Sequence, residues 1–117
     1  NEKVLAAGTQ ALLVAKEAGV KVAFGTDIAF WHEHQCEEFL IRGEVLEPAE
    51  IIRSATIIGA EVLRMEGRLG VVKPDAFADL IVVDGNPLDD LGLFQDQGAH
   101  IPVIMANGKL VKNALIG

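Results

Sequence analysis

The strongest constraint on the fold is a helix–turn–strand pattern near the N-terminus. Residues 2–18 carry apolar side chains at helical spacing, and Gly19 is the residue type that most often ends a helix in left-handed geometry. Residues 20–24, Val-Lys-Val-Ala-Phe, alternate in character and predict a strand. A helix, a tight turn and a strand in this order form the unit that α/β proteins repeat. We therefore expect an α/β fold.

A further helix is predicted over residues 47–66. Apolar side chains recur through it at helical spacing, and Pro48 suits its first turn. Thr56 and Gly59 are expected to interrupt its middle. Between the strand and this helix, residues 32–42 have the pattern of a shorter helix.

The sequence changes character after Gly67. Short β-type runs cover residues 69–72 and 80–83, with turn-forming residues between them. Residues 102–112 contain two more such runs on either side of Asn107-Gly108. An Asn-Gly pair between two β-type runs is the strongest short-range signal for a hairpin. The first 66 residues therefore predict α/β structure, and the rest predicts mostly β structure.

Charge and composition narrow the classes of partner. The net charge is −7, with 10 Lys and Arg and no basic run, so we expect no nucleic acid and no membrane as a partner. No apolar run approaches the roughly 20 residues of a membrane-spanning helix. Half of the residues are hydrophobic, which allows a core and argues against disorder. Cys36 is the only cysteine, so no disulfide can form within the chain, and a cytoplasmic location is expected.

Asp27 is the sharpest candidate for chemistry. It directly follows the predicted strand, in Gly25-Thr26-Asp27, and the active sites of α/β proteins gather at the carboxyl ends of strands. A carboxylate at this position can bind a divalent metal or move a proton. The alternative is that Asp27 caps the next helix, because Asp is a preferred N-cap residue.

Residues 32–34, His-Glu-His, are a second candidate. Two histidines two positions apart share one side of a strand and can chelate a metal from an extended segment. This trio follows a strand end and precedes a predicted helix, where positions two apart do not face each other. The alternative is therefore two solvent-exposed histidines. Cys36 is interpreted as a packing residue and His100 as a structural one.

Two acidic stretches are interpreted as turns. Asp79 opens the β-type run 80–83, and we expect its carboxylate to accept hydrogen bonds from backbone N–H groups. Residues 84–90 are dense in carboxylates but lack the spacing of an EF-hand, so they are interpreted as a solvated turn.

Five segments in order resemble the amidohydrolase superfamily, most closely its imidazolonepropionase-like and prolidase-like branch. Residues 19–27 resemble its last barrel strand, and residues 48–56 resemble its last barrel helix, with the Ala-Thr pair at the end. Residues 67–74, 78–87 and 107–111 resemble the strands that return to the small β-sandwich flanking the barrel. The resemblance covers nearly the whole chain.

The resemblance implies a fold, a reaction and roles for two residues. It implies that residues 1–66 are the last helix–strand–helix part of a (β/α)₈ barrel, and residues 67–117 are strands of a composite β-sandwich domain. It implies hydrolysis of an amide, cyclic amide or dipeptide by a metal-activated water, with one or two divalent ions, zinc by expectation. By this match Asp27 is a metal ligand that takes the proton from the attacking water and passes it to the leaving nitrogen. His34 matches a histidine that this branch often places near the substrate.

Departures from the family pattern leave the substrate open. Residues 31–36 lack the family's usual Gly and Asn, and Asp75 stands where the family has Gly in a Pro-Gly turn. The family's metal site also takes ligands from earlier strands, and a catalytic metal normally has about three protein ligands.

Only one matched ligand is present, and a barrel needs roughly 250 residues. We therefore expect the 117 residues to be part of a longer hydrolase with a small-molecule substrate, and to form a homo-oligomer. The alternative is a non-catalytic isolated chain that associates with itself.

Overall fold

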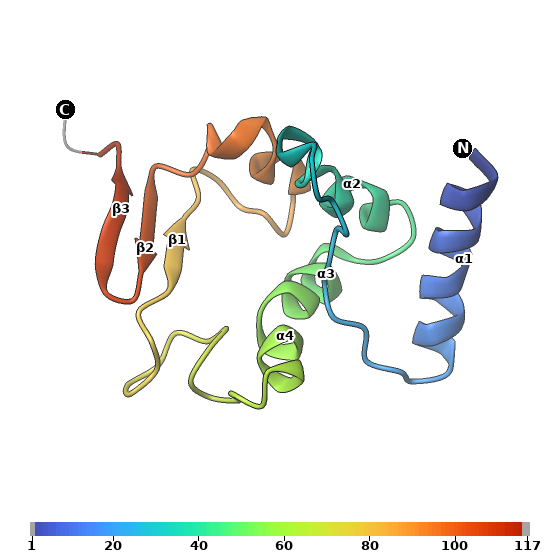
Figure 1. The fold of residues 1–117 in the computed structure, drawn as a ribbon, viewed down its shortest axis with the longest axis horizontal. Coiled ribbons are helices and arrows are strands. Elements are labelled where there is room, and N and C mark those ends of the chain that lie inside the picture. The colour runs from blue at the N-terminus through green and yellow to red at the C-terminus, as the bar shows by residue number, and fades with distance from the viewer. Residues whose placement is uncertain (1, 116–117) are drawn as a thin grey trace.

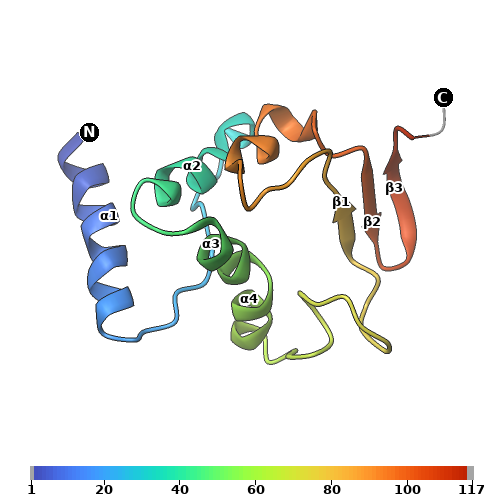
Figure 2. The same ribbon diagram turned by 180° about the vertical axis from the view of Figure 1, so that it is seen from behind.

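A computed structural model describes residues 2–115, with helices at one end and a small sheet at the other (Figure 1). The α-helices are α1 (Glu2–Glu17), α2 (Glu37–Gly43), α3 (Pro48–Ala55) and α4 (Ile57–Val62). The strands are β1 (Leu80–Val82), β2 (Val103–Ala106) and β3 (Lys109–Asn113), and the short 3₁₀ helices are η1 (His32–His34), η2 (Leu91–Phe94) and η3 (Asp96–Gly98). Seen from either side, α1 stands at the opposite end of the molecule from β3 (Figures 1 and 2).

The predicted N-terminal helix is confirmed as α1, and Gly19 follows it with a φ of 69°. No described side chain of α1 is buried, and Val4 and Val14 are 68% and 54% exposed. An ion pair of 2.8 Å between Lys16 Nζ and Glu50 Oε2 ties the end of α1 to α3. Among residues 2–115, no helix has both the length and the apolar character needed to cross a membrane.

The predicted helix 47–66 is present as α3 and α4, with the expected break at Thr56. A capping box formed by Glu47 and Glu50 starts α3. Thr56 leaves helical geometry (φ −122°, ψ −92°), which separates the two helices. Gly70 lies against this break with a φ of 67°, and a Cβ atom there would come within 2.4 Å of the Thr56 carbonyl oxygen. A residue without a side chain is therefore required at position 70.

Two predicted β-type runs are not strands in the structure. Residues 20–24 form a connecting segment, because the chain offers this run no neighbouring strand among the described residues. Residues 69–72 are also irregular, since the positive φ of Gly70 turns the backbone and Val72 is 86% exposed.

The three strands form one antiparallel sheet in the order β1-β2-β3. Asn107 and Gly108 join β2 to β3 with φ values of 48° and 76°, the geometry of a type I′ hairpin turn. The backbone N–H of Asn107 donates to Asp79 Oδ1 at 2.6 Å, and that of Gly108 donates to the Ala78 carbonyl at 3.0 Å. The predicted hairpin and the predicted role of Asp79 are both confirmed.

The core lies between the helices and the segment that leads into the sheet. Ile51 is completely buried, and Leu91 and Phe94 of η2 pack with it. Phe24, Phe39 and Phe94 form a row with 4.4 Å between successive ring centroids. The polypeptide before residue 66 and the polypeptide after it thus share one core.

Candidate active-site edge at Asp27

The segment that leads to Asp27 is fixed by the helices that follow it in the sequence. Residues 20–26 run from the end of α1 beside α3 toward η1 and α2 (Figure 1). The backbone N–H of Phe24 donates to the carbonyl of Ser54 in α3 at 3.0 Å. The Phe24 ring packs against the core that contains Ile51. The backbone three residues before Asp27 is therefore anchored.

Arg42 of α2 supplies the second anchor. Its residue is only 6% exposed, and its Nε donates to Glu38 Oε1 at 2.6 Å. Its Nη1 donates to the Ala23 carbonyl at 3.4 Å, and its guanidinium carbon lies 4.8 Å from the centroid of the Phe24 ring. The sequence reasoning missed Arg42. The Glu38–Arg42 pair at spacing i, i+4 is the signal that could have indicated it.

Asp27 itself is exposed and has a φ of 53°, a left-handed conformation that Asp tolerates better than most residues. The N-cap of η1 is Trp31 and that of α2 is Cys36, so Asp27 caps neither of the helices that follow. Within residues 2–115 the Asp27 carboxylate makes no hydrogen bond and no ion pair. The hydrogen bond beside it joins the backbone N–H of Ile28 to Thr26 Oγ1. The capping interpretation is therefore wrong, and the carboxylate faces solvent.

The predicted histidine pair is exposed and does not form a chelating pair. His34 Nδ1 lies 2.5 Å from Glu37 Oε1, and its Nε2 lies 4.0 Å from the nearer carboxylate oxygen of Glu33. The hydrogen bond with Glu37 raises the pKa of His34. In the part of the chain that the structure describes, no three His, Cys, Asp or Glu side chains lie where they could hold a metal ion. Asp27 can thus supply one ligand, and the described residues alone do not fit a metal centre.

The other two candidates have structural surroundings. Cys36 is half-buried, and burial raises the pKa of its thiol, which does not favour a nucleophilic thiolate. The side chain of His100 is exposed, and its carbonyl accepts the backbone N–H of Asp84 at 2.8 Å.

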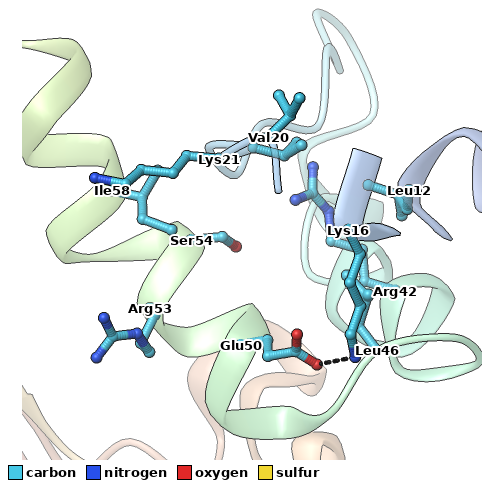
Figure 3. Close-up of a pocket in the computed structure, with 11 residues that line it drawn as sticks. Leu12, Lys16, Val20, Lys21, Arg42, Leu46, Glu50, Arg53, Ser54 and Ile58 are labelled. Atoms are coloured by element: carbon cyan, nitrogen blue, oxygen red, sulfur yellow. Dashed lines mark hydrogen bonds and ion pairs between the residues drawn. The ribbon is translucent and has the colours of Figure 1, made fainter. Parts of the chain in front are cut away.

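A hollow of about 260 Å³ lies between α1 and α3 (Figure 3). Residues 20–22, at the start of the connecting segment, line it, while Asp27 does not. The dashed line in Figure 3 marks the ion pair between Lys16 and Glu50, and Arg53 is another of the charged residues that line the hollow. This hollow is therefore separate from the edge that carries Asp27.

The described elements correspond to one part of a (β/α)₈-barrel fold with an adjoining sheet domain. The profile of the amidohydrolase family matches residues 1–111, and the chain belongs to this family.

Solved structures of amidohydrolases share this fold. One is 49% identical, with a TM-score of 0.90, and the match covers 94% of this chain and 27% of that one. A prolidase solved with N-methylphosphonate-L-proline is 46% identical, with a TM-score of 0.86 over 91% of this chain and 26% of that one. Ochratoxinase of Aspergillus niger is 32% identical over 105 residues, 88% of this chain and 22% of that protein. The chain thus spans about a quarter of the length of these relatives.

Proposed function

We propose that this chain is the C-terminal part of a metal-dependent hydrolase that cleaves carbon–nitrogen bonds in amides, cyclic amides or dipeptides. The observation that carries the proposal is the exposed carboxylate of Asp27, at the end of an anchored segment in a chain of the amidohydrolase family. The 46% identity with a prolidase supports dipeptides as one substrate class. We further propose that residues 1–66 belong to the barrel and residues 67–117 to a composite β-sandwich.

In this proposal Asp27 is both a metal ligand and a proton carrier. The metal is a divalent ion, zinc by expectation, in one or two copies, and its other ligands come from barrel strands outside this chain. When bound, such an ion supplies a water of lowered pKa. Asp27 accepts a proton from the attacking water and later donates it to the leaving nitrogen, so the carboxylate is regenerated at the end of the cycle.

His34 is proposed to contact the substrate. Glu37 holds the ring at Nδ1, while Nε2 makes no hydrogen bond within residues 2–115. That nitrogen is therefore available to a polar group of a small molecule. The net charge of −7 agrees with a small-molecule substrate rather than nucleic acid or a membrane.

The alternative proposal is a non-catalytic chain that associates with itself as a homo-oligomer. It is favoured by the exposed apolar side chains of α1 and by an open hollow of about 420 Å³. Mostly apolar side chains line this hollow, from α2, α3, β1, η2 and the segments between them. Large exposed apolar patches are rare on soluble monomers. Light scattering at low micromolar concentration tests it, and a stable, monodisperse mass near 12.5 kDa for the isolated chain contradicts it.

The decisive experiment compares two aspartates in the complete gene product that carries this chain. Asp27→Asn should lower kcat by at least about 10³-fold for dipeptide or amide hydrolysis and leave the unfolding midpoint nearly unchanged. Asp75→Asn is the matched control, because Asp75 is also exposed and has a φ of 67°. Near-normal kcat in Asp27→Asn would refute the proposed role. A His-x-His on a β-type run upstream of Asn1 in the coding sequence would support the enzyme over the alternative.

A further inference from the structure

Arg42 is the only charged residue among residues 2–115 that is buried, with 6% of its surface exposed. A charge is costly to remove from water unless other groups compensate it. Here a carboxylate oxygen of Glu38 accepts from Nε at 2.6 Å, and the face of the Phe24 ring lies 4.8 Å from the guanidinium carbon. The side chain is therefore held by specific partners, and one of them belongs to the segment that leads to Asp27.

Arg42 contacts residues 23 and 24 of that segment, and these are the last residues before Asp27 whose backbone is anchored by hydrogen bonds. Its Nη1 reaches the Ala23 carbonyl at 3.4 Å, and the next backbone N–H, that of Phe24, donates to Ser54. From residue 25 to Asp27, no backbone N–H makes a hydrogen bond within the described residues. The groups that hold residues 23 and 24 therefore also determine the position of the backbone that leads to Asp27.

We propose that Arg42 is a positioning residue for Asp27, an inference that rests on the function proposed above. The planar guanidinium performs three tasks at once: it pairs with Glu38, donates to the backbone and stacks on Phe24. A lysine ammonium at position 42 has the charge but neither the plane nor the fork of donors. Arg42 acts on geometry, because its charge is already compensated by Glu38 at one carboxylate oxygen.

The test measures the complete gene product in two ways. The variant Arg42→Met/Glu38→Gln removes the pair without leaving one charge buried alone. It should speed hydrogen exchange at the Phe24 amide by about tenfold, the equivalent of one net hydrogen bond. It should also lower kcat by about 10- to 100-fold with little change in KM, since small misplacement of a catalytic group has effects of this size. Arg42→Lys should fall between this variant and the wild type.

Arg53→Met is the matched control, because Arg53 lies on the adjacent helix, is exposed and makes no side-chain hydrogen bond or ion pair in residues 2–115. It should leave exchange and kcat unchanged. Single-turnover rates in an Asp27→Asn background then separate positioning from general stability. If Arg42 acts through Asp27, its replacement causes no further loss there.

Two results overturn the inference on its own. One is an equal loss of rate with and without Asp27, which would indicate a purely structural role. The other is unchanged exchange at Phe24 and unchanged kcat in the Arg42 variant while Asp27→Asn is inactive. Near-normal kcat in Asp27→Asn overturns the proposed function, and the positioning role with it.

Discussion

The β2–β3 hairpin and the segment 20–26 are two short, valine-containing runs with opposite surroundings. The hairpin strands pair with each other through a turn at Asn107-Gly108, and the Asp79 carboxylate closes that turn. The segment 20–26 has no strand beside it within residues 2–115, and side-chain and helix groups hold its backbone instead. The strands of the hairpin find their pairing partner across a two-residue turn. The segment 20–26 is held instead by groups of α2 and α3.

The difference follows from strand direction. Antiparallel strands need only a short turn to meet, whereas parallel strands need a crossover of a dozen or more residues and a partner from elsewhere in the chain. The segment that leads to Asp27 has no neighbouring strand within residues 2–115, and the chain spans about a quarter of its solved relatives. The candidate site therefore lies next to a segment that the described residues leave without strand pairing.

The largest expected effect is the absence of activity in the isolated 117-residue chain. With Zn²⁺ added, we expect no turnover of dipeptides or amides and only weak metal binding, because Asp27 is a single ligand and about three are needed. Hydrolysis assays and calorimetric titration with Zn²⁺ measure both. Turnover by the isolated chain that is lost in Asp27→Asn would contradict this expectation. The segment that leads to Asp27 would then function without further strands or ligands.

Next in size is the effect of Ile51→Ala. Ile51 is completely buried and Phe24 packs against its cluster, so the substitution should lower the free energy of unfolding by about 2–5 kcal/mol. It should also speed hydrogen exchange at the Phe24 amide, which donates to Ser54, before exchange in the hairpin increases. Urea unfolding and residue-resolved exchange test this, with Val111→Ala on β3, 68% exposed, as the near-neutral control. Earlier exchange in the hairpin would contradict the expectation.

A smaller loss of stability is expected when the β2–β3 hairpin is perturbed. Asp79→Ala removes the acceptor of the Asn107 N–H at 2.6 Å and should cost about 1 kcal/mol. Asp84→Ala is the matched control, because Asp84 is exposed, follows β1 and makes no side-chain hydrogen bond in the described chain. Exchange should increase at the hairpin turn and stay unchanged at Phe24. Equal changes at both places would mean that the two regions open together.

The same contrast explains what the sequence could predict. The helix α1, the break at Thr56 and the Asn107-Gly108 hairpin depend on signals within a few residues, and all three are present. Residues 20–24 have no neighbouring strand within residues 2–115, so their local β pattern did not produce a strand. The burial of Arg42 depends on the Phe24 ring and the Ala23 carbonyl, which the fold brings to it. Asp27 was predicted from a strand-end pattern, but the run before it is a connecting segment in the structure, and the role of Asp27 stays a prediction. No local pattern in the described residues supplies a second metal ligand beside Asp27.

The smallest expected effect concerns the link between α1 and α3. The hydrogen bond from Lys16, and then that from the Glu47 backbone, lower the pKa of Glu50 from its ordinary value of 4.5. A carboxyl group whose pKa is lower in the folded state stabilises the fold above its unfolded pKa and loses that contribution as the pH falls through its folded pKa. Because Lys16 and Glu50 are 47% and 40% exposed, the contribution should be only about 0.2–1 kcal/mol and should decrease with salt.

Urea unfolding of Glu50→Gln should therefore show a small loss of stability at pH 7 that disappears once the pH is below the folded pKa of Glu50. Glu17→Gln is the control, because Glu17 is exposed at the same end of α1 and has no ion-pair partner in residues 2–115. The loss should be accompanied by faster exchange in the last turn of α1, which leads directly into the segment 20–26, and by unchanged exchange in β2 and β3. A loss that persists at low pH would show that Glu50 acts through the capping box rather than through its charge.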